Sequence, residues 1–216
     1  MENSFSLIGM AAKGGWLMIV LALLSVVAIY IFAERLYVIN KVFKTDKSFM
    51  KDIKDYIYAG KVRSAKALCK RDGTPVARMI SRGVDKIDRP SAEIEKAMEN
   101  VATLEVAKLE RRLPFLATIA GGAPMIGFLG TVSGMIKAFF NMAQAGNNID
   151  ITLLSSGIYE AMITTVGGLI VGILAYFGYN YLTARVSSVV SRLETASVIF
   201  LDIVQTKDDK KVVEQI

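Results

Sequence analysis

The sequence contains no histidine and only one cysteine, Cys69, and each shortage excludes a class of chemistry. Without histidine there is no Ser–His or Cys–His catalytic pair, no HExxH zinc site and no haem ligated by histidine. The commonest proton-shuttling side chain is missing as well. A single cysteine forms no disulfide within the chain, and a lone cysteine is more often a small buried apolar residue than a nucleophile. We therefore expect no metal and no cofactor.

Nucleotide-binding motifs are also missing. The stretch GGAPMIGFLGTVSG, which begins at Gly121, is rich in glycine, but it has no GK[ST] ending and lies in an apolar run. No GxGxxG opens a helix after a predicted strand. The chain is basic, with a pI of about 9.3, yet its basic residues are interleaved with acids and form no patch studded with aromatics. We predict neither an enzyme nor a nucleic-acid-binding protein.

Charged residues are almost absent from three long apolar blocks. The chain is 53% apolar and its mean hydropathy is +0.42, well above the usual level for soluble folds. The blocks cover residues 14–33, 115–143 and 153–183, and each has the roughly 20 residues that a helix needs to cross a bilayer. The first block is too long for a signal peptide, and no small-x-small cleavage site follows it. We predict three transmembrane helices.

The positive charges predict how these helices are oriented, because loops rich in lysine and arginine near span ends stay in the cytoplasm. Most of the 26 Lys and Arg lie between Arg35 and Arg112, and several more follow the third block. The connection QAGNNID, which begins at Gln144, has none. We therefore predict that the segment between the first two blocks and the C-terminus are cytoplasmic, and that the N-terminus and the connection lie on the other side.

The segment between the first two blocks predicts short helices. Apolar residues recur at helical spacing after Leu36, and the pattern is broken at Gly60 and ends at Gly73. Pro90 then occupies a position favoured in a first helical turn. We predict an all-α membrane protein whose long helices extend into a cytoplasmic helical domain. The predicted segments are 1–13 (N-terminal, non-cytoplasmic), 14–33 (first transmembrane helix), 34–114 (cytoplasmic helical domain), 115–143 (second transmembrane helix), 144–152 (non-cytoplasmic turn), 153–183 (third transmembrane helix) and 184–216 (cytoplasmic C-terminal helix and tail).

Small residues recur at intervals of three and four in the second and third blocks, and such residues let transmembrane helices approach closely. We interpret these stripes as a packing surface between the two helices that also contributes to a subunit interface. A proline in the second block frees a backbone carbonyl, so we expect a kink or an irregular turn there. The residues selected for packing or for the kink are Pro124, Gly127, Gly130, Gly134, Gly168 and Gly172.

Glu160 is the most informative residue, because it is the only charged residue in the third block. An acid at mid-membrane is disfavoured by roughly 2.5 to 3.5 kcal/mol, and it is tolerated where it faces a bundle interior or a water-filled cavity. Thr164 and Thr165 follow it by about one helical turn and form a polar stripe with it. A carboxyl group placed in this way can take up and release a proton. Two plainer explanations stay open: Glu160 reaches the nearby interface, or it pairs with Lys137.

The stretches GGAPMIGFLGTVSGMIKAF, from Gly121, and LSSGIYEAMITTVGGLIVGILAYFGYNYL, from Leu154, closely resemble the paired signatures of the MotA/TolQ/ExbB proton-channel family, and most of all its ExbB branch. The resemblance implies that Glu160, Thr131 and Thr165 form a proton pathway. Thr164 stands where many members have a small apolar residue and is a possible additional polar lining. The resemblance also implies a multi-pass protein of the bacterial inner membrane, with a periplasmic N-terminus and a cytoplasmic C-terminus.

The same resemblance implies partners. Members of the ExbB branch form a homopentamer around an ExbD-like single-span protein, and proton flow drives a TonB-like protein that energises transport across the outer membrane. Three other functions stay open: a TolQ-like subunit of the Tol-Pal envelope-integrity system, a small secondary transporter in which Glu160 alternately binds protons and a cation, and a non-conducting scaffold. We therefore expect the phospholipid membrane, an ExbD-like protein and a TonB-like protein as partners, and no nucleic acid.

Overall fold

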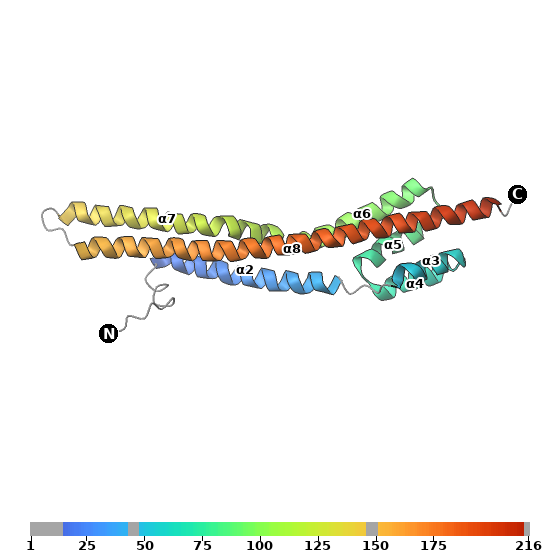
Figure 1. Cartoon of the computed structure of the whole chain (residues 1–216), viewed down its shortest axis with the longest axis horizontal. Helices are drawn as coiled ribbons and strands as arrows, with labels where there is room; N and C mark the ends of the chain where they lie inside the picture. Colours follow the sequence, from blue (N-terminus) through green and yellow to red (C-terminus); the bar gives the residue numbers. More distant parts are fainter. Residues whose placement is uncertain (1–14, 43–47, 146–150, 214–216) are drawn as a thin grey trace. The chain divides into compact units, whose positions relative to one another are not determined.

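The computed structural model describes residues 15–42, 48–145 and 151–213, and every regular element in these ranges is an α-helix (Figure 1). Three of the helices are long and apolar enough to cross a membrane. The predicted all-α class is therefore confirmed. The predicted segment 1–13 and most of the predicted turn 144–152 lie outside the described residues. The helices are α2 (Gly15–Val42), α3 (Phe49–Tyr58), α4 (Val62–Asp72), α5 (Pro75–Asp85), α6 (Ser91–Glu110), α7 (Leu113–Ala145) and α8 (Ile151–Val213).

The helices belong to two compact units, which we describe separately. Unit 1 comprises the residues up to Glu34 together with Arg112–Leu182. Unit 2 comprises Arg35–Arg111 together with the residues from Thr183 onward. The long helices α2 and α8 therefore contribute residues to both units.

Unit 1 consists of the apolar parts of α2, α7 and α8. Helices α7 and α8 run antiparallel, and α2 lies along α8 (Figure 1). Gly167 of α8 faces the side chain of Met18, and Gly178 faces the ring of Phe32, so glycines admit bulky side chains of α2. An ion pair between Arg112 and Glu34, with 2.9 Å between Nη1 and Oε2, joins the beginning of α7 to α2. Glycines on α8 and this ion pair thus hold α2 in the unit.

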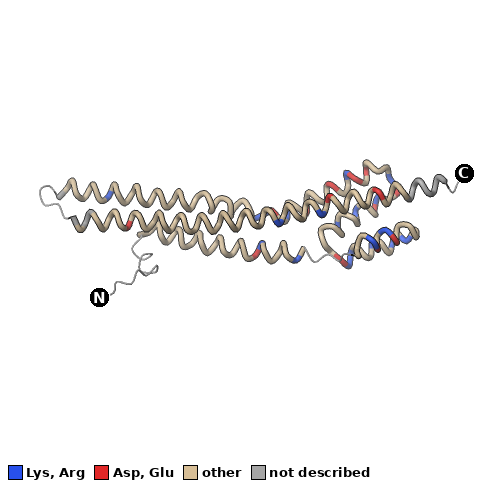
Figure 2. The backbone as a smooth tube through the Cα atoms, in the orientation of Figure 1, with Lys and Arg blue, Asp and Glu red and all other residues tan. Residues whose placement is uncertain are grey.

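Unit 1 exposes much of its apolar surface. Only 22% of the most apolar window of α2 is buried, and large side chains such as Leu23, Met125 and Phe177 are more than 60% exposed. Charged residues are rare along α7 and the first half of α8, whereas they are frequent along α3 to α6 (Figure 2). Helices that stay apolar on their outer faces are stable in hydrocarbon, where their backbone hydrogen bonds are satisfied internally. This surface requires lipid or other transmembrane helices around it.

Unit 2 begins with short amphipathic helices whose ends follow from local sequence. In α3 the buried residues are Phe49, Ile53 and Ile57, at the four-residue spacing of one helical face. Helix α4 ends at Gly73, which has a φ of 63°, a conformation that suits glycine at a helix C-terminus. Thr74 then caps α5, because its Oγ1 accepts a hydrogen bond from the N–H of Ala77 at 3.2 Å.

The core of unit 2 is closed by α8. Phe200 of α8 is fully buried, and its ring lies against Gly83 of α5 together with the side chain of Met98 from α6. A Cβ atom at Gly83 would lie 2.6 Å from the Phe200 ring, so a glycine is needed for this close packing. Helices α5, α6 and α8 therefore share one core, and α4 packs against α5.

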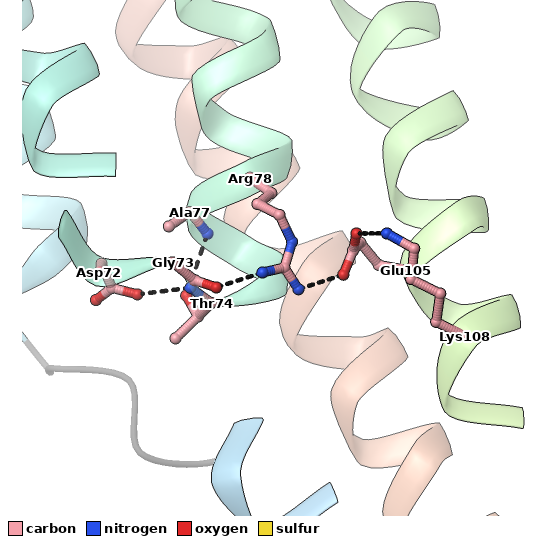
Figure 3. A network of polar contacts seen from close by, with 7 residues as sticks. All are labelled: Asp72, Gly73, Thr74, Ala77, Arg78, Glu105 and Lys108. Atoms are coloured by element: carbon pink, nitrogen blue, oxygen red, sulfur yellow. Dashed lines mark hydrogen bonds and ion pairs between the residues drawn. The ribbon is translucent and has the colours of Figure 1, made fainter. Parts of the chain in front are cut away.

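A buried acid on α6 organises a polar network in the same unit (Figure 3). The Glu105 side chain is only 5% exposed; its carboxylate accepts hydrogen bonds from Arg78 of α5 and, at 2.6 Å, from Nζ of Lys108. Arg78 also donates to the carbonyl of Gly73 at the end of α4. Burial by itself raises the pKa of Glu105, but the hydrogen bonds and charges of Arg78 and Lys108 outweigh it and hold the pKa below its usual value. One carboxylate thus connects α6 to the turn between α4 and α5.

We expect Glu105→Gln to destabilise unit 2 by about 1.5 to 3 kcal/mol at pH 7, because glutamine loses the charge that both cations contact. A lowered pKa in the folded state stabilises the protein above the unfolded value near 4.5, and this contribution is lost as the pH falls through the folded pKa. The difference between wild type and variant in thermal unfolding should therefore shrink below about pH 4.5.

The matched control is Glu93→Gln on the same helix. Glu93 is half exposed and lies 3.9 Å from Nζ of Lys86, an arrangement that contributes little. We expect a change of less than about 0.5 kcal/mol. Equal losses for the two variants would show that the buried network does not hold α5 and α6 together.

Candidate functional site

A polar pocket lies within unit 1, where the first residues of α2 meet the second half of α7 and the first part of α8. It has a volume of about 360 Å³. Glu160 from α8 and Lys137 from α7 are the charged side chains among its described lining residues. Lys137 is the only charged residue of α7, and Glu160 is the only charged residue in the unit 1 part of α8.

Two polar stripes face this pocket, each with a four-residue spacing that places its side chains on one helical face. From the sequence we predict Glu160 and Thr164 of these stripes as site residues, but not Asn141 or Ser156. The regular spacing around Lys137 and Glu160 is the signal that identifies them. The stripes are Ser133, Lys137 and Asn141 on α7, and Ser156, Glu160 and Thr164 on α8.

Gly15, the first residue of α2, lies directly against the Glu160 carboxyl group. A Cβ atom at this glycine would be 2.7 Å from Oε1 of Glu160. Gly15 also has a φ of +66°, which side chains rarely adopt. Glycine therefore permits both the backbone turn and the approach of the α2 N-terminus to the acid.

Lys137 and the N-terminus of α2 lie at the same pocket as Glu160. The N-terminus of α2 carries the partial positive charge of a helix dipole, and Lys137 brings a full charge into the same pocket. No ion pair joins Lys137 and Glu160 among the residues that the structure describes. The Glu160 carboxyl group therefore shares the pocket with Lys137 without forming an ion pair with it.

Thr131 and Thr165 lie elsewhere and do not line this pocket. The Thr131 hydroxyl donates to the carbonyl of Phe128 in its own helix at 2.7 Å. The Thr165 hydroxyl instead crosses from α8 to α7 and donates to the carbonyl of Gly127 at 3.0 Å. The structure thus brings Thr164 together with Glu160 and places Thr165 in the contact between the two helices.

This difference predicts different effects of removing the two hydroxyls. We expect Thr165→Val to lower the stability of the detergent-solubilised protein by about 1 kcal/mol, since a hydrogen bond between helices is lost. Thr131→Val removes only an intrahelical bond and is the matched control, with an expected change of less than about 0.5 kcal/mol. Thermal unfolding measures both. An equal loss for the two variants would show that the bond to Gly127 does not stabilise the pair.

The selected small residues lie where α7 and α8 approach most closely. Gly127 is in contact with Gly168, and Gly130 with Thr164, so backbones and small side chains meet directly. Gly134 packs against Ala161. Helix α7 continues through Pro124, whose ring lies against Gly172; the kink at this proline stays a prediction. This close packing positions the two polar stripes at the pocket.

The sequence of this chain is similar to those of known proteins. The sequence model of the MotA/TolQ/ExbB proton channel family matches residues 71–195. An ExbB-like biopolymer transport protein of a Synechocystis strain is 31% identical over 175 residues, which are 80% of this chain and 68% of that protein. An ExbB homolog of Methanothermobacter thermautotrophicus is 37% identical over 120 residues, 56% of this chain and 42% of that protein. The Tol-Pal system protein TolQ of Haemophilus influenzae is 39% identical over 105 residues, 47% of this chain and 46% of that protein.

The region matched by the family model, residues 71–195, includes helices α5, α6 and α7 and the first part of α8. It therefore includes every residue described at the site except those of α2. Two of these three relatives are matched over less than half of their own length. The relatives and the three apolar helices together indicate a multi-pass protein of the inner membrane. Because the family model matches more than half of the chain, and the Synechocystis relative is matched over most of it, the chain belongs to the MotA/TolQ/ExbB proton channel family.

Proposed function

We propose that this chain is an ExbB-like subunit of an inner-membrane proton channel that works with an ExbD-like single-span partner. Five copies form a ring around the partner, and the proton-motive force drives a TonB-like protein that energises transport across the outer membrane. The observation that carries the proposal is the Glu160 carboxyl group in a polar pocket between apolar helices. Membership of a proton channel family supports the same conclusion.

In this proposal Glu160 binds and releases the proton within the ring. Lys137 and the α2 N-terminus lie at the same pocket, and the proton passes from Glu160 to the partner's side chain or to water. Thr131 on α7 and Thr165 on α8 belong to the proposed pathway, and the Thr164 hydroxyl beside Glu160 donates to the backbone carbonyl of Glu160 at 3.0 Å. The N-terminus is periplasmic and the C-terminus cytoplasmic, as the positive charges predict.

A TolQ-like role is the second candidate, and the similarity to TolQ proteins of Haemophilus influenzae and Pseudomonas aeruginosa favours it. Complementation separates the two roles. An ExbB-like subunit restores TonB-dependent uptake in a strain that lacks its own ExbB, whereas a TolQ-like subunit restores resistance to detergent in a strain that lacks TolQ. Rescue of only the second strain would overturn the ExbB-like role and leave the channel function in place.

Native mass spectrometry of the detergent-extracted protein tests the assembly, with and without a co-expressed ExbD-like partner. The proposal predicts five copies that retain the partner. A small oligomer that retains no partner would instead indicate a secondary transporter centred on Glu160. A ring that retains the partner but passes no protons would indicate a scaffold.

A further inference from the structure

Two grooves flank α6 in unit 2, and the first has an acidic rim. This acidic groove lies between α6 and α8 and has a volume of about 610 Å³. Its charged lining residues are all exposed glutamates: Glu95, Glu99 and Glu110 on α6, and Glu194 on α8. Its apolar lining includes Val198, which is 60% exposed. The acidic groove is therefore an apolar depression surrounded by negative charge.

The second groove lies between α5 and α6 and has a basic rim. This basic groove has a volume of about 350 Å³ and is lined by Arg82, Lys86 and Lys96. Glu93 is the only acid among its described lining residues, and it lies beside Lys86. Leu104 is 62% exposed in this groove. The basic groove is thus an apolar surface surrounded by positive charge, on a different side of α6 from the acidic groove.

The geometry of α6 explains why the two grooves are separate. Ile94 and Met98 are fully buried and mark the stripe that packs into the core. With 3.6 residues per turn, Glu95 and Glu99 fall on one side of this stripe and Leu104 falls on the other. One copy of unit 2 therefore presents both surfaces at once, on opposite flanks of one helix.

Exposed apolar surfaces of opposite charge are complementary to each other. A contact between two different surfaces of identical chains is heterologous, and such contacts close into a ring when the rotation between neighbours is suitable. We propose that copies of this chain associate head to tail through unit 2, with the acidic groove of one copy against the basic groove of the next. The inference rests on the homo-oligomer proposed above and assigns the surface and direction of its contact.

A second copy fits this pair of grooves better than a basic segment of another protein. A basic segment matches the acidic groove alone and leaves the apolar surface of the basic groove exposed. A second copy covers both kinds of groove in every subunit of a closed ring. Charge complementarity within a single chain therefore favours self-association.

Cross-linking between differently tagged full-length copies in membranes tests the contact, in a Cys69→Ala background that removes the native thiol. One copy carries Glu99→Cys in the acidic groove and the other carries Arg82→Cys in the basic groove. With a short bis-maleimide reagent, we expect cross-linked dimers from the mixture and from neither variant alone. Lys51→Cys, on the exposed face of α3, replaces Arg82→Cys in the matched control and should give no dimer with Glu99→Cys.

Each other outcome overturns the inference. Dimers from Glu99→Cys alone would indicate a symmetric contact between like grooves. If native mass spectrometry shows an oligomer but the mixture gives no cross-links, this contact is excluded and the proposed ring still stands. If native mass spectrometry shows only monomers, both the contact and the proposed ring are excluded.

A charge exchange distinguishes a second copy from a basic partner protein. Glu194→Lys, added to the copy with Glu99→Cys, should reduce the cross-linking yield by about fivefold, because it places a positive charge in the acidic groove opposite the lysines of the basic groove. Lys96→Glu, added to the other copy, should restore the yield. A reduction that Lys96→Glu fails to restore would show that the acidic groove binds another protein.

Discussion

Glu160→Gln should reduce proton flux through the reconstituted complex by about 100-fold or more, while the complex still assembles. Glutamine has nearly the same shape as glutamate and fits the same pocket against Gly15, but it neither carries a negative charge nor exchanges a proton at physiological pH. Liposomes that contain this chain and its ExbD-like partner, with an imposed pH gradient and an internal pH-sensitive dye, measure the flux directly.

Two further variants make this result specific. Glu160→Asp keeps an ionisable carboxyl group and should retain measurable flux. Ser156→Ala changes a residue that lines the same pocket one turn away, and we expect a loss of less than about tenfold, since water can replace a hydroxyl in a wet pathway. Wild-type flux through an assembled Glu160→Gln complex would exclude this carboxyl group from the pathway.

Gly168→Ala should destabilise the protein by about 2 to 3 kcal/mol, one of the largest effects expected of adding a single methyl group. The new Cβ atom would lie 2.6 Å from the carbonyl oxygen of Ala123 and 2.9 Å from Cα of Gly127. Both are backbone atoms, so α7 and α8 must separate to make room. We expect the temperature of unfolding in detergent to fall by roughly 5 to 10 °C.

Gly121→Ala is the matched control on α7, because a Cβ atom at Gly121 meets nothing within 4 Å. Alanine is favoured over glycine in a helix by up to about 1 kcal/mol, so this variant should be unchanged or slightly stabilised. Similar losses for both variants would indicate that α7 is sensitive to any substitution. A stable Gly168→Ala protein would show that the two helices are not in close contact.

The fold class could be predicted from the sequence because its signals are local. Apolar blocks of about 20 residues predict membrane helices whatever their partners, and the resulting all-α class with three long apolar helices is confirmed. The helix ends in unit 2 follow equally local rules: Gly73 ends α4, and Thr74 followed by Pro75 begins α5.

The site could be predicted only in part. Glu160 stands out in the sequence, because an acid in an apolar helix is unusual. Its proximity to Gly15, which lies near the N-terminus, depends on how α2 packs in unit 1, and no local sequence pattern predicts it. The different roles of Thr131 and Thr165 depend likewise on which hydroxyl faces the neighbouring helix.

Composition and periodicity act over a few turns of one helix, so the amino-acid sequence alone predicts a helical chain, three apolar blocks long enough to span a membrane, and a single acid in the third block. Packing determines which residues share the pocket with Glu160 and at which glycines the backbones of α7 and α8 come into contact. It also determines that Glu105 is buried between two cations. These are contacts between segments far apart in the chain, and their energies depend on distance and burial, which only packing defines.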